Sequence, residues 1–466
     1  MMQASLDASN GKTADDSTRR WQSGSISYTR VELFKLFFWL LLGDFCWTMM
    51  ETALPKLLPL QLDAQGVHAG GIAWMMSTGS LAALILSPFI GVWSDRLRSR
   101  WGRRRPFLIC STPIMAAGLL AIPHVHNFVL LNIVVMIVQA MNVLQTVMYY
   151  LYSDVMPPTL MGRFMAAFRF VGFAGGLAFQ YFLFPYFGSN PAMVWTVCGI
   201  FYLVLFQLSL HMVKEGSYQE PERISLKEVV ARYVKDGLTG RYIWLLWLTL
   251  GTSALANPGG YFTDLFGKNE LKMTIPEIAR MNMYAMIPTM ILTLPCGWLI
   301  DRIGPRPVWA LSLFVQGCVG IAGYFAITSK FGLQVLYLAG ACTGTLASVA
   351  LMPMLYAHLP RARFGQFTST QSLVVHSMIF GSSNFLGLLI AMAGNDYRLA
   401  LLYSGVFLLF TPLFAALLKR TPCPFEPTDL AMHSQKDASA GFSQASLSHQ
   451  AKSMANESHA SKANAI

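Results

Sequence analysis

The sequence has little charge for its length. Of its 466 residues only 12% are charged, whereas 54% are hydrophobic. An ordinary soluble chain carries about a quarter charged residues, which it needs to cover its surface. Apolar windows of about 18 residues or more, the signature of membrane helices, recur along this chain. The shortage of charge therefore excludes an ordinary soluble protein and predicts a polytopic membrane protein.

The sequence also lacks the short motifs of enzymes and of metal sites. It contains no Walker loop, no Ser–His–Asp order and no metal motif. Its seven cysteines are scattered and form no CxxC pair, which argues against structural zinc and a disulfide framework. A cleavable signal peptide is not expected either, because the first thirty residues are polar and the apolar run after them is too long. We expect no catalytic residue, no metal and no cofactor.

The apolar segments predict an all-α membrane protein with twelve transmembrane helices, each long enough to cross about 30 Å of hydrocarbon. They lie at 33–60, 70–94, 105–125, 127–152, 163–187, 191–213, 241–266, 276–300, 306–328, 331–357, 363–393 and 398–418.

These helices divide the chain into five predicted parts. They are a cytoplasmic N-terminal segment (1–32), a six-helix bundle (33–213), a connector (214–240), a second six-helix bundle (241–418) and a disordered tail (419–466). In the connector, Leu226, Val229, Val230 and Val234 fall on one helical side, which favours a helix lying along the membrane surface.

The positive residues predict the orientation, because Lys and Arg accumulate in cytoplasmic loops. The stretch SDRLRSRWGRRRPF (94–107) carries six arginines between two apolar segments, whereas the loops after helices 1, 3 and 5 carry no Lys or Arg. Both termini are therefore expected in the cytoplasm, and we expect a monomer in the plasma membrane. The partners expected are the lipid bilayer and a small solute. The arginine loop has no folded reader domain around it, so we expect no nucleic acid.

The two halves of the chain repeat two short motifs. GVWSDR (91–96) recurs as GWLIDR (297–302), and MPPTLMGRF (156–164) is echoed by LPRARF (359–364). Parallel repeats of this kind predict two pseudo-symmetric halves related by an axis along the membrane normal, with a solute site between them near the midplane.

The GVWSDR motif with the basic residues after it resembles the loop between helices 2 and 3 of the major facilitator superfamily. Its longer form, through RSRWGRRRPF, resembles sucrose permeases and their animal solute-carrier relatives, within the glycoside–cation symporters. YFTDLFG (261–267) resembles a second stretch of those permeases. The resemblance implies the major facilitator fold, alternating access and proton-coupled transport of a sugar, a disaccharide such as sucrose or maltose. Two alternatives stay open: a facilitator or symporter for another small polar solute, and a membrane receptor that does not transport.

The resemblance also implies a gate on the cytoplasmic side. Asp95 is placed to meet the start of helix 11, and by pseudo-symmetry Asp301 faces the start of helix 5. The alternative for the arginines is solvated positive-inside charge, and Asp154 is expected to pair with a loop arginine. The residues assigned to gating are Asp95, Arg96, Arg103, Arg163, Asp301, Arg302, Arg361 and Arg363 at the cytoplasmic side, and Asp264 at the outer end of helix 7. Asp264 belongs either to an outer gate or to the solute site.

Helix 1 carries two carboxylates where hydrocarbon makes charge costly. Asp44 and Glu51 lie seven residues apart, so they and Thr48 share one helical face, about 10 Å apart along the axis. The GDF stretch resembles the KDF of melibiose permeases, which implies that Asp44 binds sugar, with Trp47 against an apolar sugar face. The alternative is a buried ion pair of Asp44 with Lys56 or Arg169.

Other polar residues within helices complete the predicted site. Helix 4 carries a polar stripe with Asn142, Thr146 and Tyr149, which is typical of a hydroxyl-binding surface and equally of packing between helices. Asn257 belongs to ANPGGY, where we expect helix 7 to be broken or bent. His376 in helix 11 relays protons or is a neutral histidine bonded to a neighbouring helix.

The sequence departs from the families it resembles at the coupling sites. The positions of the melibiose-type sodium aspartates are Ala83 and Ser87, and those of the plant sucrose-permease aspartate and arginine are Val138 and Tyr149. A carboxyl without water around it favours its protonated form, and a neighbouring carboxylate favours that form further. Glu51 is therefore assigned to the proton and Asp44 to the sugar.

Overall fold

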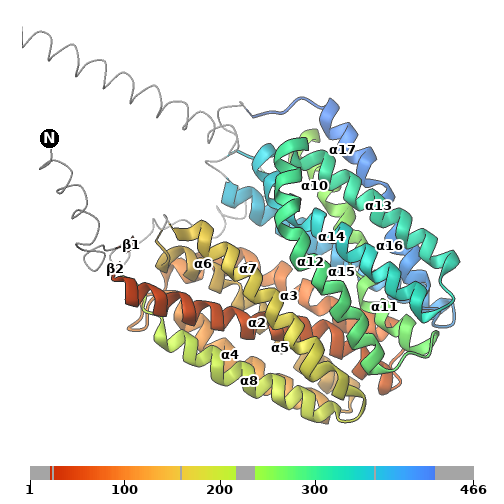
Figure 1. Cartoon of the computed structure of the whole chain (residues 1–466), viewed down its shortest axis with the longest axis horizontal. Coiled ribbons are helices and arrows are strands. Elements are labelled where there is room, and N and C mark those ends of the chain that lie inside the picture. Colours follow the sequence, from red (N-terminus) through yellow and green to blue (C-terminus); the bar gives the residue numbers. More distant parts are fainter. Residues whose placement is uncertain (1–20, 24–25, 158–159, 217–236, 361–363, 426–466) are drawn as a thin grey trace, which may run out of the picture.

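The computed structural model describes residues 21–23, 26–157, 160–216, 237–360 and 364–425. The described part is almost entirely helical, and Figure 1 shows two bundles that meet near α11 and diverge toward the end that holds β1, β2 and α6. We call the end at which they meet the outer end, because the positive residues predict it to be extracellular, and the opposite end the inner end.

The first bundle contains the helices of the N-terminal half, and α2 runs through its whole length. Its helices are α2 (Arg30–Ala64), α3 (Ala69–Arg96), α4 (Arg105–Ala121), α5 (Phe128–Gln145), α6 (Val147–Val155), α7 (Met161–Ala178) and α8 (Pro191–Met212), with short turns η1 (Ile122–His124), η3 (Phe179–Leu183) and η4 (Phe184–Gly188). A hairpin of β1 (Trp21–Ser23) and β2 (Ile26–Tyr28) precedes them and was not expected from the sequence.

The second bundle contains the helices of the C-terminal half. They are α10 (Arg241–Ala256), α11 (Gly259–Asn269), α12 (Ile275–Ile303), α13 (Pro305–Ala326), α14 (Lys330–His358), α15 (Phe364–Met392), α16 (Leu399–Leu409) and α17 (Thr411–Arg420). The surface helix predicted in the connector and most of the predicted tail lie outside the described residues.

Ten helical segments of the described part are long and apolar enough to cross a membrane, and α12 makes an eleventh although it bends by 52° beside Pro295. The remaining predicted span, 241–266, is divided between α10 and α11 by the break at Asn257–Pro258. Each piece is shorter than the roughly 20 residues of a continuous span. The interruption expected in ANPGGY is therefore present, and it is a complete helix break.

Capping explains why α2 begins three residues before the predicted boundary. The Thr29 hydroxyl accepts a hydrogen bond from the Glu32 amide at 3.4 Å, and the Glu32 carboxylate accepts one from the Thr29 amide at 2.9 Å. This reciprocal pair satisfies two donors that a helix start otherwise leaves unpaired.

The exposed surface of the bundles is apolar, as expected of helices that face lipid. Large side chains such as Phe34, Phe331 and Met392 are exposed. Between helices, small residues allow the close packing that membrane bundles use in place of hydrophobic burial from water. At Gly175 of α7, a β-carbon would lie only 2.5 Å from the backbone oxygen of Phe45 in α2.

This close approach predicts that Gly175→Ala destabilises the protein. The added methyl meets backbone, which does not move aside cheaply, so we expect a loss of about 1–3 kcal/mol and a lower unfolding midpoint of the purified protein in detergent. Gly344→Ala is the control, because nothing lies within 4 Å of its added carbon and alanine favours a helix by up to about 1 kcal/mol. Equal midpoints for the two variants would contradict the prediction.

Candidate functional site

A central cavity of about 480 Å³ lies between the two bundles. Residues of both bundles form its wall, from α2, α3, α5, α6, α11 and α15. They are Trp47, Glu51, Leu54, Pro55, Met76, Gly79, Ser80, Ala83, Ser87, Pro88, Ile90, Gln139, Asn142, Val143, Thr146, Tyr150, Tyr261, Thr368, Ser369, Ser372 and His376.

Five of the predicted site residues line this cavity: Trp47, Glu51, Asn142, Thr146 and His376. Three of them carry a buried polar atom without a hydrogen-bond partner among the described residues, namely Trp47 Nε1, Asn142 Oδ1 and His376 Nδ1. Buried polar groups are almost always hydrogen-bonded in native proteins. These three atoms themselves are shielded from water-sized contact, so in this structure they lie just behind the cavity surface.

Asp44 and Thr48 do not line the cavity, which corrects their predicted contact with the solute in this conformation. Asp44 is completely buried, and its Oδ1 accepts a hydrogen bond from the Thr48 hydroxyl at 3.4 Å. Its Oδ2 faces α7, where a β-carbon at Gly172 would lie 3.2 Å away. Because glycine stands at this position, α7 packs closely over the carboxyl.

Tyr149 and Asn257, also predicted to bind solute, lie elsewhere than in the central cavity. The Tyr149 ring packs edge-on against Trp47, with centroids 5.3 Å apart, and thereby supports the cavity wall. Asn257 lines a second cavity of about 310 Å³ in the C-terminal bundle. Its Oδ1 accepts a hydrogen bond at 3.0 Å from the hydroxyl of Tyr261, which lines the central cavity.

Glu51 is exposed to the central cavity and is the one acidic residue in its wall. Arg169, on α7 and also exposed, is near enough to interact electrostatically with both Glu51 and Asp44. Within the described residues Arg169 forms no ion pair at contact distance. Neither alternative partner therefore forms a close ion pair with Asp44, since Lys56 pairs with Asp264.

Asp264 joins the two bundles at the outer end. Its Oδ2 accepts a hydrogen bond from Lys56 Nζ of α2 at 2.9 Å, and its Oδ1 accepts from the Tyr337 hydroxyl and from Asn282 Nδ2, the latter at 3.3 Å. Lys56 Nζ donates to Asn282 Oδ1 as well, at 2.9 Å. Side-chain exposure is 22% for Lys56 and 5% for Asp264, so the pair is largely removed from water.

A second contact between α2 and α11 lies farther out. Asp63 accepts hydrogen bonds from Lys268 Nζ at 2.7 Å and from Asn269 Nδ2 at 3.0 Å. The Tyr397 hydroxyl reaches the same carboxylate at 3.4 Å. The outer end of the molecule is therefore closed by two successive sets of polar contacts between the bundles.

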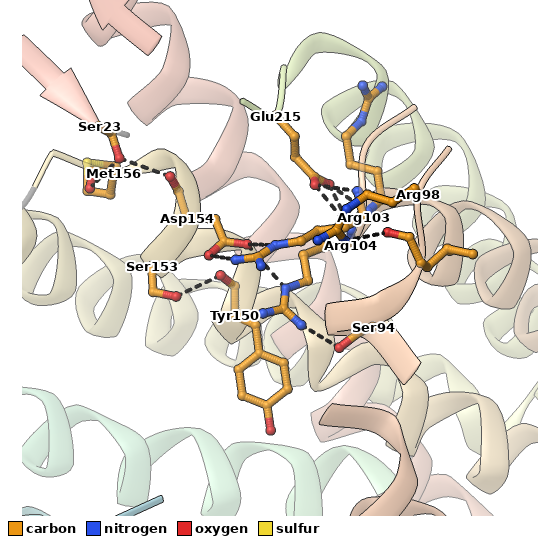
Figure 2. Close-up of polar contacts among 12 residues, drawn as sticks. Ser23, Ser94, Arg98, Arg103, Arg104, Tyr150, Ser153, Asp154, Met156 and Glu215 are labelled. Carbon is orange, nitrogen blue, oxygen red and sulfur yellow. Dashed lines mark hydrogen bonds and ion pairs between the residues drawn. The ribbon is translucent and has the colours of Figure 1, made fainter. Parts of the chain in front are cut away.

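The arginine loop at the inner end is tied to its own bundle (Figure 2). Arg103 donates two hydrogen bonds to Asp154, at 3.0 and 2.7 Å, and Arg104 donates to it at 3.2 Å. Arg104 also donates to Ser94, and its guanidinium lies 5.1 Å from the centre of the Tyr150 ring. The predicted pairing of Asp154 with a loop arginine is confirmed. Arg103, assigned to a gate between bundles, makes these contacts within the first bundle.

Glu215, just after α8, fixes the same loop through its backbone. Its carboxylate accepts hydrogen bonds from three consecutive amides, those of Arg103, Arg104 and Arg105, at 2.8, 3.1 and 2.7 Å. Gly102 makes this approach possible, because its φ is +106° and a β-carbon there would lie 2.6 Å from Glu215.

The cytoplasmic gate pairs are not formed by the described residues. Asp301 and Arg163 are both exposed and form no ion pair there, and the Arg302 guanidinium lies over the ring of Trp298. The side chains of Asp95 and Arg96, and all of Arg361 and Arg363, lie outside the described residues. Since these pairs were expected to close the inner end in the opposite conformation, they stay predictions.

The sequence matches the family model described as Major Facilitator Superfamily over residues 36–277, just over half of the chain. The chain belongs to the major facilitator superfamily. It is therefore an integral membrane protein and a transporter, not an enzyme, as the sequence predicted.

Superfamily members that transport sugars are among its relatives over short stretches. The sucrose transport protein SUC3 of Arabidopsis thaliana is 29% identical over 67 residues, which are 14% of this chain and 11% of the relative. The proton-associated sugar transporter A of Homo sapiens is 40% identical over 73 residues, 15% of this chain and 9% of the relative. The chain thus spans about a tenth of the length of the curated relatives it matches.

Solved transporters of the superfamily share the fold over most of their length. A bacterial homologue of the human lysosomal transporter Spinster, solved in an inward-facing and unoccupied conformation, covers 84% of this chain and 98% of its own at a TM-score of 0.68 and 14% identity. A D-xylose–proton symporter covers 82% and 97% at a TM-score of 0.62 and 14% identity. At these identities the likeness shows the fold alone.

The sequence did not predict that residues at the outer end pair with one another across the two bundles. Lys56 was considered only as a partner of Asp44, and Asp63 and Lys268 were given no role. The sequence did contain an indication of these contacts, because each of the three residues lies near the outer end of a predicted span. What the sequence did not supply was the register of α2 against α11.

The Lys56–Asp264 contact predicts the conformational effect of Asp264→Asn. Losing a hydrogen bond to a charged group costs about 1.5–3 kcal/mol, so the outer end should open about tenfold more often or more. The measurement is the labelling rate, from the outer side, of a cysteine at Leu54 of the cavity wall in a background without the other cysteines.

Glu277→Gln is the matched control for this experiment. It breaks the Lys330–Glu277 pair, which lies within the second bundle, and should leave the labelling rate unchanged. Equal rates for Asp264→Asn and the unmodified background would rule out a closing role for the Lys56 contact.

Proposed function

We propose that this transporter carries a sugar together with protons by alternating access, across the plasma membrane with both termini in the cytoplasm. The observation that carries the proposal is the central cavity: it lies between the bundles and is lined by amide and hydroxyl side chains and one carboxyl group, while polar contacts close the outer end. A disaccharide such as sucrose or maltose is the solute proposed first.

The chemistry of the wall favours a neutral solute with many hydroxyl groups. Gln139, Asn142 and Thr146 line one side, and Ser369 and Ser372 line the other. Amide and hydroxyl groups both donate and accept hydrogen bonds, as sugar hydroxyls do. The volume of about 480 Å³ is within the range of roughly 300–1,000 Å³ common for small-molecule sites. The similarity to a sucrose transport protein and to a proton-associated sugar transporter supports the same solute class.

In the proposed alternating-access cycle, this structure corresponds to the state that is open toward the inside. The outer end is closed by Lys56 with Asp264 and by Asp63 with Lys268. In the opposite state these contacts separate, and the predicted pairs of Asp95 with Arg361 and Arg363, and of Asp301 with Arg163, close the inner end. A solute shifts this balance only through its different affinity for the two states.

Coupling to protons is assigned to Glu51, because this carboxyl faces the cavity water and is the acidic group that a solute meets. In the outward-open state Glu51 takes a proton. Arg169 of α7 is the cation near enough to act on the Glu51 carboxyl. His376, at the opposite side of the cavity, remains a second candidate for the proton.

The proposed function is tested with the purified chain in lipid vesicles. Labelled sucrose and maltose should accumulate above their equilibrium level when the outside is acidic, and only equilibrate without a pH gradient. Equilibration that is insensitive to pH would show a facilitator instead. Absence of uptake and of sugar binding would exclude sugar transport.

Glu51 and Asp44 are predicted to differ, although they lie on the same helix face. Glu51→Gln should abolish accumulation driven by a pH gradient while sugar exchange continues, because the amide cannot carry the proton. Asp44→Asn is the matched change at a buried site without cavity contact, and sugar exchange should continue. Accumulation by Glu51→Gln in response to external acid would disprove the assignment.

A further inference from the structure

The second cavity, which we call the hinge cavity, lies beside the break between α10 and α11. Its volume is about 310 Å³, and its wall includes Asn257 and Gly260 at the break together with residues of α13, α14 and α16. Tyr261, the next residue along the chain, lines the central cavity and donates its hydroxyl hydrogen to Asn257 Oδ1. The two cavities therefore adjoin the same helix break and are linked by one hydrogen bond.

The wall of the hinge cavity combines apolar side chains, such as Leu313 and Leu336, with a few uncharged polar ones. None of its lining residues is an Asp, Glu, Lys, Arg or His. Gln316 of α13, half-buried, makes no side-chain hydrogen bond within the described part of the chain, so both its carbonyl oxygen and its amide hydrogens are available. Asn257 uses its oxygen for Tyr261 and keeps two amide hydrogens to donate.

Two hydroxyl groups add acceptors to these amides. Ser404 Oγ donates to the backbone oxygen of Ala256 at 2.8 Å, and Thr263 Oγ1 donates to that of Gly259 at 2.9 Å. Each hydroxyl oxygen keeps lone pairs that accept a hydrogen bond. The wall thus presents donors and acceptors together without a charge, which is the complement of a neutral hydroxylated molecule.

The size of the cavity limits the occupant. A volume of about 310 Å³ is at the lower end of the range for small-molecule sites, roughly 300–1,000 Å³, and suits one sugar ring better than two. Glycine keeps this space open, because a β-carbon added at Gly260 or Gly340 would meet nothing within 4 Å.

We propose that the hinge cavity binds one neutral hydroxylated ring, and this inference rests on the proposed sugar transport. The ring is either one half of a disaccharide whose other half occupies the central cavity, or a separate monosaccharide. Both share the chemistry that the wall recognises. In either case the ring would bind beside the helix break that carries Tyr261 of the central cavity.

The test uses two variants of the whole chain and two labelled sugars, sucrose and glucose, in equilibrium dialysis. Gly340→Val fills the hinge cavity, and Gln316→Leu removes its free amide at nearly constant volume. Gly344→Val is the matched control: it lies one helical turn from Gly340, has open space around it and lines neither cavity. Unfolding midpoints establish that all three variants remain folded.

We expect Gln316→Leu to weaken sugar binding about tenfold, which is the loss of one or two hydrogen bonds. Gly340→Val should weaken it as well, because the added side chain takes up space in the cavity, and Gly344→Val should bind as before. Weakened sucrose binding with unchanged glucose binding identifies the ring of a disaccharide. A glucose stoichiometry that falls by one site identifies a separate monosaccharide.

Two further outcomes separate the inference from the function on which it rests. If the unmodified chain binds sugar and both variants bind it equally well, the hinge-cavity inference is wrong and the proposed transport stands. If the unmodified chain binds neither sugar, the proposed function fails, and the inference fails with it.

Discussion

Lys56 and Asp264 form the more buried of the two ion pairs that join the bundles in the described part of the chain. A charge in a medium of low dielectric is expensive unless it is paired and its remaining hydrogen-bonding positions are filled. Here Asn282 and Tyr337 fill them, so the pair is fully satisfied only while α2 of one bundle lies against α11 of the other. That requirement fixes the outer end. It also positions Tyr261, one turn before Asp264, in the wall of the central cavity.

The inner end is organised differently, and the contrast explains how such a molecule can move. Arg103, Asp154 and Glu215 hold the arginine loop to helices of the first bundle, so these contacts make one bundle rigid and do not join the two. In the described part of the chain, the ion pairs that link the bundles lie at the outer end. Breaking a few polar contacts there would let two internally rigid bodies rotate, which is the motion that alternating access needs.

Much of the fold was predictable from the sequence, because lipid leaves a chain few choices. Backbone groups in hydrocarbon must be satisfied within the helix, so long apolar runs fix where helices lie, and Pro258 with two glycines marks the break in helix 7. The site was predictable only in part. Trp47, Glu51, Asn142, Thr146 and His376 do lie in the cavity wall, because polar residues in apolar helices avoid lipid, and their contact with a solute stays a prediction. Which helix covers which residue depends on packing between helices, and helix periodicity does not predict that packing.

Asp44 shows this limit most clearly. By helix geometry it shares a face with Glu51, since seven residues make nearly two turns, yet Glu51 is exposed to the cavity and Asp44 is completely buried. The difference is made by α7, whose Gly172 lies against the Asp44 carboxyl. Burying a carboxyl group is costly unless it is hydrogen-bonded, and the Thr48 hydroxyl supplies one such bond. Arg169, the cation near both carboxyl groups, lies on the same helix. The electrostatics of both carboxyl groups are thus tied to the packing of a single helix.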